Sequence, residues 1–300
     1  KHIKDMKHLI TLSVLGWAAA FTLLFMLFSV VSQAQKGNEG LVQEKMDNQI
    51  AVLNKMVTVD TSVVECIYHY SVIDRDLQDM REYDVIMEIG DPICKYEDYN
   101  AFRLDSVFAS IGYDKVTNRL FYNLSRRYDC TSTESLMENL SSNNLEFYGR
   151  VFIDNFVYQE PIPNMNWTLS DSTKEVCGNL CHMATCEFRG YKWIVFYSEI
   201  PQSVGPWKLN GLPGLILEAK TEDNDHRFSA IAIRKSHSPI KYAKRDYFKT
   251  TRKKYNKSLS EYRTNPGKLL SNTPFAPKDA KGNAVPIPKR KLFFNPLEKE

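Results

Sequence analysis

The sequence predicts a mainly β fold: a curved antiparallel sheet arranged as a meander, with minor helix and an extended basic C-terminal segment. Two observations favour this class. The chain of 300 residues contains 16 Tyr and 16 Phe, and aromatic side chains suit the half-buried surface of a sheet. Segments rich in such residues also recur at short spacing with turn residues between them, which indicates hairpins rather than alternating strands and helices.

Three segments in the first half of the chain have the composition of strands. Residues 63–72 are rich in β-branched and aromatic side chains. Residues 83–91 form a second strand that ends in a Gly-Asp-Pro turn, and residues 147–158 return to strand composition. The polar residues 129–144 predict a surface loop before the third segment.

The best-defined block of strands follows in the second half of the chain. Arg189-Gly190 is expected to be a two-residue hairpin turn in which Gly supplies the left-handed conformation. A second, polar turn is expected at residues 221–225. Strands joined by turns of this kind predict an antiparallel meander, with at most one helix later, around residues 245–262. The four strands are expected at residues 181–188, 191–197, 215–220 and 227–233.

The most specific stretch is the decapeptide at residues 205–214, which contains two Pro and three Gly. Pro restricts φ, and Gly permits positive φ or the close approach of another segment. The decapeptide therefore predicts a turn whose φ values other residues cannot easily adopt, and the apolar residues 215–217 continue into the core. We expect a structural rather than a catalytic role for its signature residues, which are Gly205, Pro206, Gly211, Leu212, Pro213 and Gly214.

With the string Gly-Leu-Pro-Gly-Leu-Ile at residues 211–216, the chain resembles the GLPGLI family of exported proteins from Bacteroidetes-type Gram-negative bacteria. The resemblance is densest over residues 167–233 and extends more loosely over most of residues 61–300. It implies that residues 94–106 continue the second strand. It also implies an accessory component rather than an enzyme. The matching strings include Cys181-His182-Met183-Ala184-Thr185, Phe188-Arg189-Gly190 and Glu199-Ile200-Pro201.

The N-terminal part of the chain predicts export. Residues 6–34 read as a signal peptide, with a basic start, an apolar stretch and a Ser-Gln-Ala cleavage site at its end. The alternative is that the apolar stretch Leu9–Val31 is retained as a membrane anchor, since it is long enough to span a bilayer. Residues 35–60 are expected to be a linker. We therefore expect a periplasmic or envelope-associated protein that contacts the membrane only through an uncleaved signal.

Charge is distributed unevenly along the chain. Residues 234–300 hold 18 Lys or Arg and 5 Asp or Glu, a net of +13, whereas residues 36–233 hold 18 basic and 30 acidic residues, a net of −12. A GLPGLI-type β domain over residues 61–235 is thus followed by a basic segment, residues 236–300. That segment could fold back on the acidic part or contact an envelope protein or an anionic surface. Export argues against a nucleic-acid partner.

The six cysteines gain meaning from the predicted export. An oxidising compartment and an even count favour disulfides. The alternative is a metal or hydrolytic site within residues 177–186, which also contain His182. Strand alternation argues against such a site, because Cys181 and Cys186 would point to opposite faces of the sheet. We therefore expect no cofactor. The candidate disulfide cysteines are Cys66, Cys94, Cys130, Cys177, Cys181 and Cys186.

Aromatic and basic residues near the signature turn could form a binding platform if they share one face. The alternative is that Trp193 and Tyr197 pack on the sheet and Trp207 covers its edge, because aromatic residues of strands usually belong to the core. The platform candidates are Trp167, Arg189, Trp193, Tyr197 and Trp207.

No sequence motif supports catalysis. The chain contains no Gly-x-Ser-x-Gly, His-Glu-x-x-His, Walker or Gly-x-Gly-x-x-Gly string. Together with the resemblance, this predicts an exported non-catalytic cell-envelope protein of the GLPGLI family that acts as a binding or accessory component. The alternative is a periplasmic metal-handling protein or hydrolase that uses residues 177–186.

Overall fold

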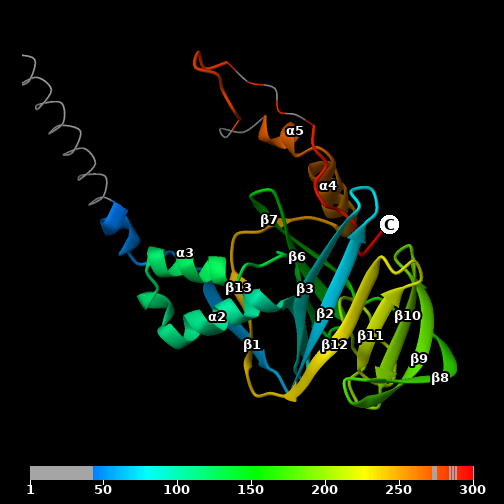
Figure 1. The fold of residues 1–300 in the computed structure, drawn as a ribbon. Coiled ribbons are helices and arrows are strands. Elements are labelled where there is room, and N and C mark those ends of the chain that lie inside the picture. The colour runs from blue at the N-terminus through cyan, green and yellow to red at the C-terminus, as the bar shows by residue number, and fades with distance from the viewer. Residues whose placement is uncertain (1–42, 272–275, 284, 286, 288, 300) are drawn as a thin grey trace, which may run out of the picture. The chain divides into compact units, whose positions relative to one another are not determined.

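The computed structural model describes residues 43–271, 276–283, 285, 287 and 289–299. The predicted signal peptide, residues 6–34, lies outside the described residues, as does the start of the predicted linker. The chain divides into two units, one of residues 1–52 and 110–126 and the other of residues 53–109 and 127–300. Figure 1 shows the chain coloured from its N-terminus to its C-terminus.

The smaller unit contains a short helix at residues 43–47, the 3-10 helix η1 (Tyr113–Lys115) and α3 (Asn118–Arg127). Backbone hydrogen bonds join its two segments. The Ala51 N–H donates to the Val116 carbonyl at 2.8 Å, and the Asn118 N–H donates to the Gln49 carbonyl at 2.8 Å. Ala51 and Val116 are also buried, so main-chain pairing and a small apolar contact hold this unit together.

The larger unit is built mainly of strands. These are β1 (Lys55–Thr61), β2 (Val64–Asp74), β3 (Asp79–Ile89), β4 (Ile93–Asp98), β5 (Ser135–Asn139), β6 (Asn144–Val151), β7 (Asp154–Pro161), β8 (Thr168–Val176), β9 (Asn179–Phe188), β10 (Tyr191–Ser198), β11 (Ile216–Thr221), β12 (His226–Lys235), β13 (Pro239–Lys244) and β14 (Phe248–Lys249). Its helices are α2 (Tyr99–Ile111), α4 (Arg252–Thr264) and α5 (Pro266–Leu270). β1 lies at the end of the range expected to be a linker and pairs antiparallel with β13.

The main sheet of the described residues has twelve strands in the order β14-β7-β6-β5-β4-β3-β2-β12-β11-β10-β9-β8. It consists of two meanders, because β2 to β7 are neighbours in chain order and so are β8 to β12. The two meanders meet where β12 pairs antiparallel with β2, drawn in yellow and blue in Figure 1. The predicted antiparallel meander with minor helix is confirmed.

Each predicted strand segment overlaps a strand of the structure, but residues 147–158 hold the end of β6 and the start of β7 rather than one strand. The hairpin at residues 189–190 is also confirmed: Phe188 pairs with Tyr191, which leaves a loop of two residues. Arg189 has φ 53° and Gly190 has φ 81°. Positive φ at both central residues is what a type I′ turn requires, and this turn type matches the twist of the flanking strands.

The surface loop predicted for residues 129–144 was wrong, because β5 lies inside this range. Leu136 and Glu138 of β5 are both buried, each 1% exposed. The strand pairs with β4 on one side and β6 on the other. Its polar composition hid a central strand that buries a carboxyl group as well as an apolar side chain.

The continuation of a strand through residues 94–106, implied by the family resemblance, was also wrong. β4 ends at Asp98 and α2 begins at the next residue. The Asp98 carboxylate accepts hydrogen bonds from the backbone N–H groups of Asn100 at 2.9 Å and Ala101 at 3.3 Å. An acidic side chain that accepts these unpaired donors is a helix N-cap, and it ends the strand here.

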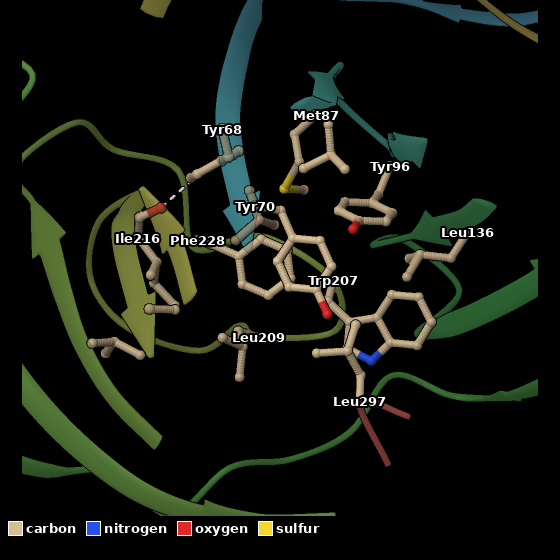
Figure 2. Packing of buried hydrophobic residues seen from close by; sticks show 14 of the residues in the cluster. Tyr68, Tyr70, Met87, Tyr96, Leu136, Trp207, Leu209, Ile216, Phe228 and Leu297 are labelled. Carbon is tan, nitrogen blue, oxygen red and sulfur yellow. Dashed lines mark hydrogen bonds between the residues drawn. The ribbon is translucent and has the colours of Figure 1, made fainter. Parts of the chain in front are cut away.

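The core lies on one face of the main sheet, where aromatic rings from both meanders meet. Pairing places Tyr70 opposite Phe228 and Tyr83, and the ring centroids lie 4.2 and 5.2 Å from that of Tyr70. We call the side of the sheet that carries these three residues the core face. Figure 2 shows its centre, where the Tyr68 hydroxyl donates to the Ile216 carbonyl at 2.7 Å.

The basic C-terminal segment folds back on the β domain, one of the arrangements that the charge distribution allowed. Its helix α4 begins after Thr251, whose side chain accepts a hydrogen bond from the Lys254 N–H at 3.4 Å. No helix in the described part of the chain has the length and apolar character needed to span a membrane. Ion pairs between basic residues of the segment and acidic residues of the β domain include Arg252–Glu160 at 3.3 Å, Lys291–Asp74 at 3.7 Å, Lys299–Asp223 at 3.6 Å and Lys241–Asp105 at 3.5 Å.

Candidate functional site

The signature turn belongs to a loop, residues 199–215, that connects β10 to β11. We call it the signature loop. Its backbone is closed on itself, because the Gly211 N–H donates to the Ser203 carbonyl at 3.1 Å and the Ser203 hydroxyl donates to the Leu212 carbonyl at 2.6 Å. Residues 204–210 between these contacts are buried. The loop therefore carries part of the core rather than a flexible surface.

The glycines of the signature loop are needed for two different reasons. Gly211 has φ 87°, which confirms the predicted unusual backbone at this position. Gly205 and Gly214 lie outside the left-handed region, so the φ argument was wrong for Gly214, and the close approach of another segment is the alternative that holds for both. A Cβ at Gly214 would lie 1.7 Å from the Ser198 carbonyl oxygen, and one at Gly205 would lie 2.7 Å from Ile216 Cβ. These two positions require glycine because another segment passes too close.

Lys208 of the signature loop is fully buried, with 0% exposure. Its ammonium Nζ lies 2.7 Å from Glu160 Oε1 and 2.5 Å from Glu298 Oε1, and it donates to the Tyr158 hydroxyl at 3.0 Å. The same Nζ lies 5.5 Å from the ring centroid of Trp207. A buried lysine is tolerated only where carboxylates and polar groups replace its water, and this position provides both.

Two arginines complete a charge cluster around Lys208. Arg189 Nη2 lies 3.2 Å from Glu160, and Arg252 lies 3.3 Å from Glu160 and 3.2 Å from Glu298. Three cations thus share two carboxylates. The cluster joins the signature loop to β7, the 189–190 turn, α4 and the C-terminus, so it anchors elements that are distant in sequence.

The last described residues, 293–299, cross the core face; we call them the C-terminal strap. The Phe294 N–H donates to the Asp74 carboxylate at 2.8 Å, and the Asn295 side chain donates to the Ile73 carbonyl at 2.7 Å. The Lys299 N–H donates to the carbonyl of residue 189 at 2.9 Å. Together with Glu298 in the charge cluster, these bonds hold the strap along its length.

A buried histidine supports the strap through a tyrosine. The Tyr191 hydroxyl lies 2.8 Å from the Pro296 carbonyl and 2.9 Å from His226 Nε2. His226 Nδ1 lies 2.8 Å from the Tyr70 hydroxyl. Since Tyr191 donates to the carbonyl, it must accept from His226, which assigns the proton to Nε2 and leaves Nδ1 to accept from Tyr70.

This histidine predicts a pH dependence of stability. Burial lowers the pKa of His226 from 6.5 to about 4, so the folded protein keeps it neutral while the unfolded chain takes up a proton. The contribution of neutral His226 to the free energy of unfolding is therefore complete above pH 6.5. It is lost as the pH falls toward 4, by about 3 kcal/mol in total. Urea unfolding at several pH values should show a steeper loss for the wild type than for His226→Gln. Parallel pH profiles would contradict the assignment.

A cavity of 170 Å³ lies on the core face beside Trp207, between the sheet, α4 and the C-terminal strap. Its apolar wall is mostly aromatic, and the Trp207 ring packs edge-on against Tyr96 at 5.7 Å and Phe147 at 5.7 Å. Figure 2 shows Trp207 between Tyr96 and Leu297 of the strap. The aromatic and apolar wall consists mainly of Tyr70, Tyr83, Tyr96, Phe147, Trp207 and Leu259.

Polar groups also line this cavity. Trp207 is 4% exposed and its indole Nε1 has no hydrogen-bond partner among the described residues. The Glu134 carboxylate accepts a bond from the Tyr255 hydroxyl at 3.3 Å. Burial raises the pKa of Glu134, against the opposing effects of Tyr255 and Arg263. Arg81, Arg150 and Arg263 also belong to the polar lining, so the cavity combines ring surfaces with basic side chains.

The candidate platform residues do not share one exposed surface. Trp193 is fully buried and Trp207 nearly so, at the core face. Trp167 is half-buried and its Nε1 donates to the Asn210 carbonyl at 2.8 Å. Tyr197 is half-buried beside His182, with ring centroids 5.8 Å apart, and Arg189 belongs to the charge cluster. Of the five, Trp207 alone lines the cavity.

The six cysteines are all free thiols in the structure. The prediction that they form disulfides was therefore wrong. Cys66 and Cys94 are buried, and burial raises the pKa of each thiol to about 12. Cys177 is exposed in the turn between β8 and β9. The predicted alternation of Cys181 and Cys186 is confirmed by register, because Cys181 pairs with Ser198 and Cys186 with Trp193. A disulfide requires two cysteines whose Cβ atoms lie close together. An even number of cysteines in the sequence does not ensure this.

The alternative site at residues 177–186 has no metal geometry in the structure. Within the described residues, no group of three or more His, Cys, Asp or Glu side chains could hold a metal ion. His182 is half-buried and pairs across the sheet with Tyr197.

No known family model matches the chain, and no curated protein matches it. Among solved structures it is similar to PNGF-II, in structures from two space groups. The P21 structure matches with a TM-score of 0.45 and 11% identity, covering 68% of this chain and 34% of the PNGF-II chain. The C2 structure matches with a TM-score of 0.44 at the same identity and coverage. The chain thus spans about a third of the length of PNGF-II.

Sequence reasoning missed most of the residues that build the site. Lys208 had one signal, a charged residue between Trp207 and Leu209 in an otherwise apolar and turn-forming string. Glu298 lies in a segment that resembled the family, but nothing indicated its partner. Arg81 and Arg263 come from β3 and α4 and line one cavity only in the folded chain, so no local pattern marks them.

Proposed function

We propose that this is an exported, non-catalytic cell-envelope protein of the GLPGLI family that acts as a binding component and holds a small molecule in the cavity of the core face. Export and family rest on the N-terminal sequence and on the signature loop. The observation that carries the binding role is the cavity beside Trp207, whose mostly aromatic wall also contains the half-buried guanidinium groups of Arg81 and Arg263, neither within 4 Å of a carboxylate oxygen among the described residues. A ligand with an acidic group would supply the anion that these two guanidinium groups lack.

The surroundings of the cavity also support binding rather than catalysis. Its walls are fixed by the sheet, the charge cluster and the C-terminal strap, and such pre-formed, mostly apolar cavities with a few polar groups are typical ligand sites. The nearby charged residues Lys208, Arg252 and Glu298 are engaged with one another. The basic segment, which was expected to contact a partner or an anionic surface, contributes α4 and the strap to the cavity wall.

A cavity-filling variant tests the proposed function. Asn256 lines the cavity from α4, whereas its neighbour Lys257 is exposed and is not part of the wall. In isothermal titration of the full chain with benzoate and with benzamide, we expect at least one of them to bind the wild type saturably. Asn256→Phe should weaken that binding by about tenfold or more, because the added ring occupies the space, and Lys257→Phe should leave it unchanged. Equal effects of the two variants would contradict binding in the cavity.

A further inference from the structure

The cavity has the size of one ring. An engineered cavity of about 150 Å³ in another protein holds a benzene molecule, and the cavity described above measures 170 Å³. Tyr70 and Tyr83 meet edge to face at 5.2 Å in its wall, and Phe147 and Tyr255 at 5.0 Å. Rings placed in this way leave faces and edges for another aromatic ring. The apolar part of a ligand is therefore limited to a single ring or a short chain.

Two half-buried arginines at the cavity lack a carboxylate partner among the described residues. Neither Arg81 nor Arg263 has an Asp or Glu oxygen within 4 Å among the described residues, whereas the similarly half-buried Arg189 and Arg252 both do. Arg81 instead lies over the Phe293 ring of the strap, 4.4 Å from its centroid. A half-buried guanidinium without an anion retains donors suited to a carboxylate or similar group.

The acidic residues of the cavity do not replace a ligand anion. Glu298 is committed to Lys208 at 2.5 Å and to Arg252 at 3.2 Å. Glu134 accepts a hydrogen bond from Tyr255; burial raises its pKa and the charge of Arg263 acts in the opposite direction, but no oxygen of Glu134 lies within 4 Å of the Arg263 guanidinium. Among the described residues, Arg81 and Arg263 are therefore half-buried cations of the cavity that no carboxylate contacts; the third arginine of the wall, Arg150, is exposed.

We infer that the cavity selects a small organic anion, a carboxylate on a single ring or short apolar chain, with Arg81 and Arg263 contacting the acid group. This inference rests on the proposed function and adds the ligand class to it. The aromatic wall accounts for the apolar part and the two arginines for the charge, so neutral and cationic analogues of the same shape should bind less well.

Isothermal titration with three one-ring probes tests the inference on the full chain. We expect benzoate to bind about tenfold or more tightly than benzamide, and benzylamine to bind most weakly, because bonds to a charged group are the stronger ones. Arg263→Gln and Arg81→Gln should each weaken benzoate binding by about tenfold while leaving benzamide unchanged. Arg245→Gln is the matched control, since Arg245 is exposed and outside the cavity wall. Circular dichroism and thermal unfolding confirm that each variant is folded.

The possible outcomes separate the two claims. If benzamide binds as tightly as benzoate and the two arginine variants change neither, the anion inference fails while binding in the cavity stands. Preference for benzylamine would also overturn the inference. Absence of binding by all three probes to the wild type would overturn the inference and the proposed function together. Loss of benzoate affinity in Arg245→Gln as well would attribute the effect to net charge and contradict the assigned residues.

Discussion

Replacement of Lys208 by methionine is expected to lower the free energy of unfolding by about 3 kcal/mol or more. Lys208 is fully buried and its Nζ lies within 2.7 Å of both Glu160 and Glu298. Removing the ammonium leaves two desolvated carboxylates with Arg189 and Arg252 as their remaining partners. Methionine keeps much of the side-chain volume, so the loss reports on charge rather than on a cavity.

Urea unfolding measures this effect, and Lys192→Met provides the control. Lys192 also forms a 2.6 Å ion pair, with Glu222, but both side chains are about half exposed. Exposed pairs contribute only about 0–1 kcal/mol, so this variant should unfold near the wild type. A Lys208→Met protein as stable as Lys192→Met would show that the cluster does not anchor the fold. Combining Lys208→Met with Glu298→Gln should cost less than the sum of the single changes, because the pair is coupled.

The strands and tight turns were predictable because their signals are local. The alternation of buried and exposed side chains and the left-handed conformation of Gly190 both depend on a few neighbouring residues. The sequence therefore predicted the position of the 189–190 hairpin correctly. The helix α2 was missed although its cap is also local. Asp98 has the right chemistry, but the apolar and aromatic residues around it resemble a strand, and only the bonds from Asn100 and Ala101 distinguish the two.

The site could not be predicted because it depends on contacts between distant segments. The C-terminal strap contains Glu298, yet its partners Lys208 and Arg252 lie in the signature loop and in α4. Composition showed that the basic segment could fold back on acidic residues, but not which residues would pair. The platform prediction failed for a related reason: aromatic residues such as Trp193 and Trp207 are close in sequence, but the fold buries them in the core.

Gly214→Ala is expected to destabilise the protein by about 3 kcal/mol or more, although alanine is the smallest possible change. The added Cβ would lie 1.7 Å from the Ser198 carbonyl oxygen and 2.9 Å from its carbon. These are backbone atoms at the end of β10, where Ser198 also pairs with Leu215 through a 2.9 Å hydrogen bond. The strand or the signature loop must move, and overpacking of this kind exceeds the usual 1–3 kcal/mol when backbone is displaced.

Gly178→Ala separates this steric effect from backbone strain. Gly178 has φ 73° and open space around the position of a Cβ, so alanine there should cost only about 1–2 kcal/mol. Chemical denaturation measures the free energy of unfolding of both variants. If Gly214→Ala does not fold, the yields of folded protein are compared instead. A Gly214→Ala protein more stable than Gly178→Ala would contradict the close approach of β10. If Gly214→Ala is the less stable variant, as expected, the close contact at Gly214 positions the signature loop on the core face, and Trp207 and Lys208 with it.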